Sequence, residues 1–195
     1  MTAPIRLETP LSDEDVTRLQ VGDFVLLSGS IYTARDAAHE RLSQLLRQRE
    51  KVPLELRGAV IYYCGPTPPR PGRPIGSAGP TTASRMDPFT PIILSQGVKG
   101  MIGKGRRSAE VREAILRYRC VYFGAVEGAA ALLGQRVKAA EVVAFPDLGP
   151  EAIYHFVVED FPLVVINDIL GNDLYDVGLR RFARSSAAAL PGAEP

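Results

Sequence analysis

The chain has 195 residues, 46% apolar and 23% charged, and its 23 basic and 22 acidic side chains give a formal net charge of +1. This length and composition indicate one globular α/β or α+β domain with a buried core. The charge balance excludes a dedicated nucleic-acid or membrane-surface protein, because such proteins carry an excess of Lys and Arg. No apolar run is long enough for a membrane span, and no signal pattern precedes residue 10. We therefore expect a cytoplasmic protein.

The chain contains only two cysteines, Cys64 and Cys120, and both lie in apolar, strand-like runs. A structural zinc site or an iron–sulfur cluster needs three or four ligands. We therefore expect two reduced, buried thiols and no metal bound by this chain alone.

In chain order, residues 5–10 are extended, and Ser12 with Asp15 has the spacing of a capping box at the start of a short helix. Residues 24–27 are typical of a buried strand and 28–30 of a turn. Apolar residues at helical spacing predict a helix over 34–49, with Thr33 and Asp36 as a second capping pair. A strand over 59–64 follows.

The loop over 65–80 contains six prolines and four glycines, and we interpret it as a functional surface loop. After it, the pattern predicts helical pieces over 81–86 and 88–96, a strand over 98–102, a basic glycine loop over 103–107 and a helix over 108–118. A strand over 120–123 and a helix of small residues over 125–133 come next.

Three strand-like segments, 137–145, 153–158 and 163–167, have no helix between them. Helices therefore alternate with strands early in the chain, and strands accumulate late. The sequence predicts a three-layer α/β domain over residues 1–183 with a mixed sheet or two sheets. Residues 184–195, rich in Ala, Ser and Pro, are expected to form a disordered tail.

Three predicted helix starts carry a cation, namely Arg35, Arg85 and Lys104. Unpaired backbone N–H groups and a long cationic side chain together form the usual binding site for a carboxylate or phosphate. Any one of these could be an ordinary surface cation. If the fold brings all three together, the site would suit a small polyanion.

Other polar residues near these starts have a structural and a functional interpretation. Thr81 and Thr82 could be helix caps or substrate contacts, and His39 could make a hydrogen bond along its helix or support the site from behind. Residues 103–105 are not a Walker loop, because the required upstream glycine and the following Ser or Thr are missing. His155 lies in an apolar strand, which favours a structural role.

Four motifs occur in order along the chain: TARDAAH over 33–39, GPTTASRMD over 79–87, GKG over 103–105 and GNDLY over 171–175. They resemble the C-terminal domain of class I fumarases, which in two-subunit members, including the L-tartrate dehydratases, is a separate β subunit. The resemblance covers residues 7–175. It implies a swivelling three-layer β/β/α domain that closes over a [4Fe–4S] cluster held by a separate, cysteine-bearing α subunit in a hetero-oligomer.

Position by position, the resemblance assigns Arg35 and Arg85 to the substrate carboxylates, Lys104 to further charge neutralisation, and Thr81 to proton abstraction from carbon. Supporting roles behind these groups fall to the remaining polar residues of the motifs and their neighbours, namely Asp36, His39, Thr82, Asp87 and Arg106. Arg106 departs from the family pattern, in which an asparagine often follows the Lys-Gly pair, so Arg106 could face the substrate, the partner or solvent.

The resemblance favours the reversible hydration of fumarate to L-malate, with a small dicarboxylate as substrate. The alternatives are the β subunit of an L-tartrate dehydratase or related hydroxy-diacid dehydratase, and a non-catalytic module that binds small anions. The isolated chain is expected to expose an apolar patch and to form homo-oligomers.

Overall fold

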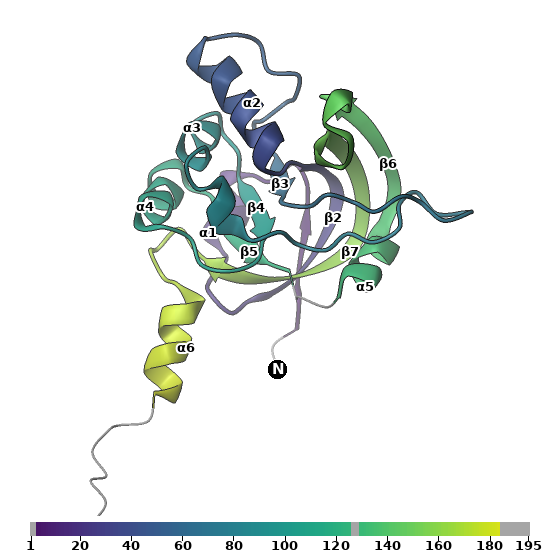
Figure 1. Ribbon diagram of the computed structural model, residues 1–195. Helices are drawn as coiled ribbons and strands as arrows, with labels where there is room; N and C mark the ends of the chain where they lie inside the picture. Colours follow the sequence, from purple (N-terminus) through teal and green to yellow (C-terminus); the bar gives the residue numbers. More distant parts are fainter. Residues whose placement is uncertain (1–2, 126–128, 184–195) are drawn as a thin grey trace, which may run out of the picture.

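The computed structural model describes residues 3–125 and 129–183 (Figure 1). The strands are β1 (Ile5–Glu8), β2 (Phe24–Thr33), β3 (Val60–Tyr62), β4 (Gly100–Gly103), β5 (Val121–Gly124), β6 (Val137–Ala144) and β7 (Ile153–Asn167). The α-helices are α1 (Asp13–Thr17), α2 (Asp36–Arg47), α3 (Thr90–Leu94), α4 (Ala109–Tyr118), α5 (Ala130–Arg136) and α6 (Leu174–Phe182). Two 3₁₀ helices are η1 (Ala83–Met86) and η2 (Pro146–Glu151).

One mixed sheet holds all seven strands, in the order β1-β2-β3-β4-β5-β7-β6. Strands β1 to β5 are mutually parallel, whereas β7 is antiparallel to β5 and to β6. Strand β7 also pairs with β2, so β2, β3, β4, β5 and β7 form a closed ring. The mixed α/β class is as predicted, and the sheet partly closes into a barrel.

Strands β2 and β7 are each longer than predicted, because each continues through a position where the sequence predicted a break. Residues 28–30 were expected to form a turn, but β2 continues through them to Thr33. Gly29 has a φ of +101° and sits at a β-bulge against β7, so its left-handed backbone bends the strand without ending it. Similarly, β7 joins the two predicted strands over 153–158 and 163–167 through Asp160, whose φ is +47°.

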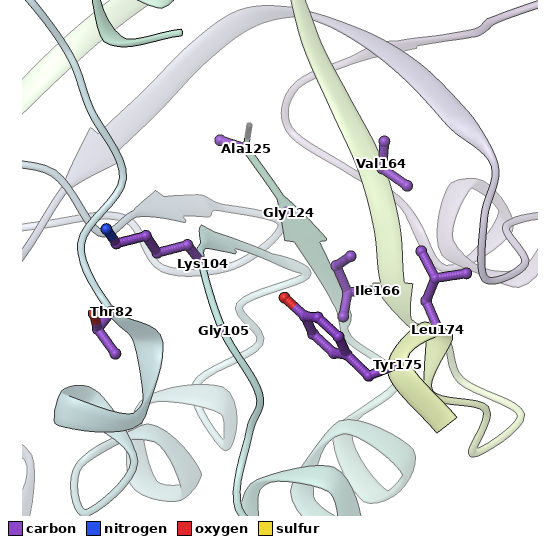
Figure 2. A pocket seen from close by; sticks show the side chains of 9 residues that line it. All are labelled: Thr82, Lys104, Gly105, Gly124, Ala125, Val164, Ile166, Leu174 and Tyr175. Atoms are coloured by element: carbon purple, nitrogen blue, oxygen red, sulfur yellow. The ribbon is translucent and has the colours of Figure 1, made fainter. Parts of the chain in front are cut away.

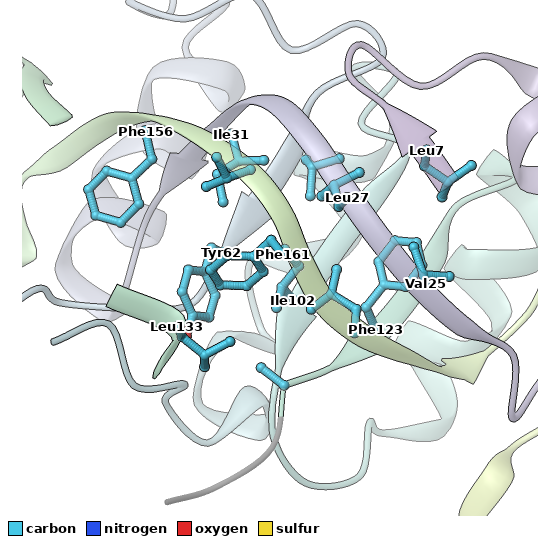
Figure 3. Packing of buried hydrophobic residues seen from close by; sticks show 14 of the residues in the cluster. Leu7, Val25, Leu27, Ile31, Tyr62, Ile102, Phe123, Leu133, Phe156 and Phe161 are labelled. Carbon is cyan, nitrogen blue, oxygen red and sulfur yellow. The ribbon is translucent and has the colours of Figure 1, made fainter. Parts of the chain in front are cut away.

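The apolar residues form two cores, one on each side of the parallel strands. The first fills the ring and includes Leu27, Tyr62, Phe123, Phe156 and Phe161, all fully buried (Figure 3). The second packs helices α2, α3 and α4 against the outer face of the sheet, which Figure 1 shows on one side of the molecule. Alternating strand residues supply both cores, since consecutive side chains point to opposite faces.

Several helix ends follow their predicted signals. Ser12 and Asp15 form the expected capping box of α1, and Ser108 caps α4 by accepting a hydrogen bond from Val111 N. The capping pair predicted for α2 is wrong, because Arg35 is the N-cap residue and the Thr33 hydroxyl accepts a hydrogen bond from Tyr154 N instead. The helix predicted over 125–133 is displaced to α5.

Helix α6 has no counterpart among the predicted elements. Figure 1 shows it extending away from the sheet, and none of its residues is buried. The predicted tail over 184–195 lies outside the described residues. Among the helices of residues 3–125 and 129–183, none has the length and apolar character needed to cross a membrane.

Candidate functional site

The candidate residues gather at the carboxyl edge of the parallel strands. Arg35 lies two residues after the end of β2, and Lys104 directly follows β4. Thr81 N donates a hydrogen bond of 2.6 Å to Tyr63 O, which comes directly after β3. In open α/β sheets, ligands bind at this edge, where loops and helix N-termini converge.

Asp36 links the two arginines. Its Oδ1 lies 2.7 Å from Arg85 Nε, and its Oδ2 lies 3.8 Å from Arg35 Nη2. Two positions that are 50 residues apart in sequence are therefore brought to one carboxylate. Asp36 Oδ2 and Arg35 Nε are both buried, and neither has a hydrogen-bond partner among the residues that the structure describes. Arg85 keeps half of its side chain exposed, so it can contact a ligand from solvent.

Glu151, which the sequence gave no reason to select, completes this group. It lies at the end of η2, and its Oε1 is 3.2 Å from Arg35 Nη2. Its Oε2 accepts a hydrogen bond of 3.2 Å from Ala37 N at the first turn of α2. Helix N-termini favour negative charge, so this carboxylate offsets the unfavourable position of Arg35 at the start of α2.

The third predicted cation, Lys104, contacts the segment before Arg85 through backbone hydrogen bonds. Lys104 N donates to Thr81 O at 3.3 Å, Ala83 N donates to Lys104 O at 2.8 Å, and Thr82 forms a parallel bridge with Lys104. These bonds fix the residues before Arg85 against the end of β4. The three predicted cations are therefore linked through intermediate residues, Lys104 to the segment before Arg85 by backbone hydrogen bonds and Arg85 to Arg35 through Asp36.

A pocket of about 600 Å³ opens beside Lys104. Figure 2 shows Thr82 and Lys104 on one side and the apolar groups of Val164, Ile166, Leu174 and Tyr175 on the other. Tyr175 belongs to the GNDLY motif and is brought to the site by α6, whose N-cap Asp173 accepts a hydrogen bond from Tyr175 N. The pocket thus has Thr82 and Lys104 on one wall and mainly apolar groups on the opposite wall, and neither Arg35 nor Arg85 is among the described residues that line it.

His39 holds the start of α2 from inside the protein. Its Nδ1 lies 3.0 Å from Arg35 O, and because a carbonyl can only accept, this nitrogen carries the proton. The ring also packs edge-on against Tyr63 at 5.2 Å. Burial lowers the pKa of His39 to about 4, and the Arg35 carbonyl opposes that shift only in part. His39 is therefore neutral at pH 7 and supports the backbone of Arg35.

Asp87 lies in a buried cluster with Arg107, in contrast to the half-exposed Arg85. It accepts hydrogen bonds from Arg107 Nε at 2.8 Å and from Ser108 N at 2.7 Å. The Arg107 side chain is fully buried and also donates to Thr90 Oγ1 and to the Tyr63 hydroxyl. This cluster ties η1 and α3 to the start of α4, which gives Asp87 a structural role.

Arg106, the position that departs from the family pattern, points to α6. Its guanidinium lies 2.7 Å from Asp176 Oδ1 and stacks over the Tyr175 ring, with 5.2 Å to the centroid. The Asp176 carboxylate raises the pKa of Arg106 above its ordinary value. Arg106 therefore anchors the helix that carries Tyr175.

The two cysteines are buried thiols, as expected. Burial raises the pKa of both Cys64 and Cys120 to about 12, so neither is a thiolate at neutral pH. Cys64 belongs to the core inside the ring and Cys120 to the core under the helices. Among the residues that the structure describes, no three His, Cys, Asp or Glu side chains are placed to hold a metal ion.

Comparison with known proteins places the chain in a family. A family model described as "Fumarase C-terminus" matches residues 1–178. The chain belongs to the fumarase C-terminus family. The match includes all four motifs, and Arg35, Arg85 and Lys104 lie within the matched residues.

The relatives are of two lengths. The chain is 37% identical over 175 residues to "Fumarate hydratase class I, anaerobic" of Escherichia coli, covering 88% of the chain and 32% of that protein. It is 36% identical over 176 residues to "Fumarate hydratase 1, mitochondrial" of Leishmania major, covering 88% and 32%. It thus spans about a third of these fumarate hydratases.

A relative of similar length comes from Methanocaldococcus jannaschii and is provisionally named L(+)-tartrate dehydratase subunit beta. The identity is 40% over 172 residues, which covers 85% of the chain and 88% of that protein. Members of the family therefore include both long fumarate hydratases and a short protein named as a subunit.

Proposed function

We propose that this chain is the β subunit of a two-subunit, iron–sulfur-dependent hydro-lyase that interconverts fumarate and L-malate. One observation carries the proposal: Arg35 and Arg85 both lie within ion-pair distance of Asp36, at 3.8 Å and 2.7 Å, at the carboxyl edge of the parallel strands. Two neighbouring guanidinium groups suit a substrate with two carboxylates, because each planar fork matches one carboxylate. The named activities of the long relatives support a four-carbon diacid.

The reaction makes a specific electrostatic demand. Removing a proton from the carbon next to a carboxylate places a second negative charge on that carboxylate. Fixed cations stabilise such a developing charge most when they are oriented before the reaction begins. Arg35, whose Nη2 pairs with Glu151 at 3.2 Å, meets this condition.

Lys104 and Thr81 complete the chain's contribution. In the proposal, Lys104 adds positive charge beside the pocket, and the Thr81 hydroxyl takes part in removing the carbon-bound proton. The backbone of Thr81 is hydrogen-bonded to Tyr63 and to Lys104, and these bonds fix the position of Thr81 relative to Lys104. A neutral hydroxyl is a weak base, so it requires a carboxylate supplied by the partner.

The residues of this chain do not fit an iron–sulfur cluster. It has two cysteines in all, and they lie in different cores with their thiols protonated. Such a cluster takes several thiolate ligands. The proposal therefore assigns the [4Fe–4S] cluster to a cysteine-bearing α subunit, and none to this chain.

Exposed apolar residues on and before α6 support a partner. Leu170 is 64% exposed, and Leu179 and Phe182 on α6 are 62% and 77% exposed. Large apolar side chains left exposed in this way are candidates for a protein interface. In the proposal, this domain swivels to close over the cluster of the α subunit, and the hetero-oligomer acts in the cytoplasm.

A second substrate is favoured by one comparison. The relative that matches this chain along most of its own length carries a tartrate dehydratase name. Tartrate and malate differ by a hydroxyl on the same diacid, so two arginines bind either one. Tartrate is therefore the alternative substrate. A non-catalytic role in binding small anions is the remaining alternative.

The test is anaerobic co-expression with a cysteine-bearing α subunit, followed by hydration and dehydration assays on fumarate, L-malate and L-tartrate. The proposal predicts fumarate hydration by the complex and none by this chain alone. Turnover of L-tartrate alone would establish the second substrate. Dicarboxylate binding without turnover of any diacid would establish the non-catalytic role.

A further inference from the structure

We infer that Glu151 is a positioning residue, which fixes the Arg35 guanidinium in the orientation that receives a substrate carboxylate. The inference rests on the proposed function of Arg35 and deepens it. It concerns a residue that belongs to none of the four motifs and is contributed by the connection between β6 and β7.

The two oxygens of Glu151 have separate partners. Oε1 pairs with Arg35 Nη2 at 3.2 Å, and Oε2 accepts from Ala37 N at 3.2 Å. The carboxylate therefore joins the guanidinium of the N-cap residue to the backbone of the same helix. Glutamine would keep an acceptor for Ala37 N but lose the ion pair with Arg35, and aspartate is shorter by one methylene, so neither reproduces both contacts.

The connection that carries Glu151 is itself fastened to α2. Arg41 pairs with Asp147 through two hydrogen bonds of 2.8 Å, and the same guanidinium stacks over the Phe145 ring at 4.8 Å. A loop anchored one turn further along the helix cannot easily withdraw its carboxylate. This anchoring favours a permanent support for Arg35 over a carboxylate that leaves when substrate arrives.

Close packing leaves Arg35 little freedom on its other side. A Cβ atom at Gly65 would lie 2.9 Å from Pro150 O and 3.2 Å from both Cδ and Nη1 of Arg35. The absence of a side chain at Gly65 thus lets the start of the loop over 65–80, the Pro150–Glu151 segment and Arg35 meet. Nη2 is held by Glu151, while Nε lacks a hydrogen-bond partner.

The opposite role for Glu151 would be to compete with the substrate carboxylate for Arg35. A carboxylate beside Arg35 could weaken substrate binding by neutralising the arginine, and its removal would then tighten binding. A positioning residue has the reverse effect, because Arg35 loses its orientation. The sign of the change in dicarboxylate affinity therefore separates the two roles.

The first experiment measures the NMR signals of the Arg35 guanidinium in the full chain. Glu151→Gln and Glu151→Asp should each shift the Nε–Hε signal and speed its exchange with water. The matched control is Glu159→Gln, which removes an exposed carboxylate on β7 that pairs with Lys138 at 3.0 Å, and should leave the Arg35 signal unchanged. Thermal melts identify any variant that fails to fold, in which case Glu151→Asp alone is compared. An unchanged Arg35 signal in a folded Glu151 variant would overturn the inference.

The second experiment measures kcat/KM for fumarate in the complex with the α subunit. Both Glu151 variants should lower it by about fivefold to twentyfold, and neither should lower it further in an Arg35→Ala background. A tighter KM in Glu151→Gln would show a competing charge and overturn the inference. Normal kinetics in the Glu151 variants with a large loss in Arg35→Ala would also overturn it but leave the proposed function intact. Normal kinetics in Arg35→Ala would refute both.

Discussion

Two groups of arginine and aspartate side chains differ in burial and in hydrogen bonding. Arg107 is fully buried, and its guanidinium has hydrogen-bond partners on all three nitrogens, including Asp87 and Thr90. Arg35 and Arg85 share Asp36, are partly exposed, and leave Arg35 Nε and Asp36 Oδ2 without a hydrogen bond. The buried and fully bonded Arg107 is a scaffold, whereas the partly exposed Arg35 and Arg85 are suited to a ligand.

This contrast has a physical basis. A buried charge is stable only when partners replace its lost hydration, so a complete set of hydrogen bonds is what a structural arginine requires. A ligand-binding arginine must keep donors for its ligand, and it bears that cost only near solvent. Burial and hydrogen-bond completeness therefore distinguish the two roles more reliably than the residue type.

The largest expected effect comes from breaking the buried pair. Arg107→Ala should lower the free energy of unfolding by about 3–5 kcal/mol, because Asp87 would keep a buried charge with no cation. Chemical denaturation measures this directly. A change in stability as small as that of an exposed arginine would show that the buried cluster is not the scaffold.

Removing one member of the exposed group should affect kinetics and not folding. Arg85→Lys keeps the charge but loses the planar fork, so the transition state should lose about 1.5–3 kcal/mol of stabilisation. This corresponds to a fall in kcat/KM for the diacid of roughly tenfold to a hundredfold or more. The melting temperature should stay constant. Arg47→Lys, in the last turn of α2 and exposed, is the control and should change neither quantity. A lower melting temperature with normal kinetics would instead give Arg85 a structural role.

The buried histidine behind Arg35 predicts a pH effect on stability. The unfolded chain protonates His39 near pH 6.5, whereas the folded protein does so only near pH 4, because burial lowers its pKa. Stability present at neutral pH is therefore lost as the pH falls from about 6.5 to about 4. Between pH 7 and pH 5 the loss should be about 2 kcal/mol. His39→Gln should remove this part of the pH dependence, and an identical slope in both proteins would contradict a neutral, buried His39.

The smallest effect is expected at Arg106. Its ion pair with Asp176 is exposed on both sides, and such pairs contribute little to stability. Arg106→Gln should leave the melting temperature unchanged and alter kcat/KM only slightly, through the position of Tyr175. Thermal melts and steady-state kinetics check this. A loss as large as that of Arg85→Lys would show that Arg106 faces the substrate.

Local signals predicted much of the fold. Ser12 and Ser108 fix helix starts through caps that depend on neighbouring residues alone, and both were identified correctly. The predicted turn at residues 28–30 failed because Gly29 is also compatible with a bulge, and only the pairing of β2 with β7 decides between them. Helix α6 was missed, although Asp173 is an available N-cap before Leu174 and Tyr175.

In the candidate site, too, features set by neighbouring residues were predicted and contacts between distant segments were not. The sequence selected Arg35, Arg85 and Lys104 as cations at helix starts, and of these three Arg35 alone lies at one, as the N-cap residue of α2. Arg85 lies in the last turn of η1, and Lys104 directly follows β4. Glu151 was not identified, because its contact with Ala37 spans 114 residues and depends on how η2 packs against α2. Sequence patterns also could not separate Arg106 from Arg107, since only burial distinguishes these adjacent arginines.

The most direct test of the central claim is a crystal structure of the protein with a bound four-carbon dicarboxylate. The account predicts one carboxylate on the Arg35 guanidinium and the other on Arg85, with Lys104 beside them and Arg107 unchanged in its buried cluster. A dicarboxylate bound elsewhere, with Arg35 and Arg85 still paired only to Asp36 and Glu151, would contradict it.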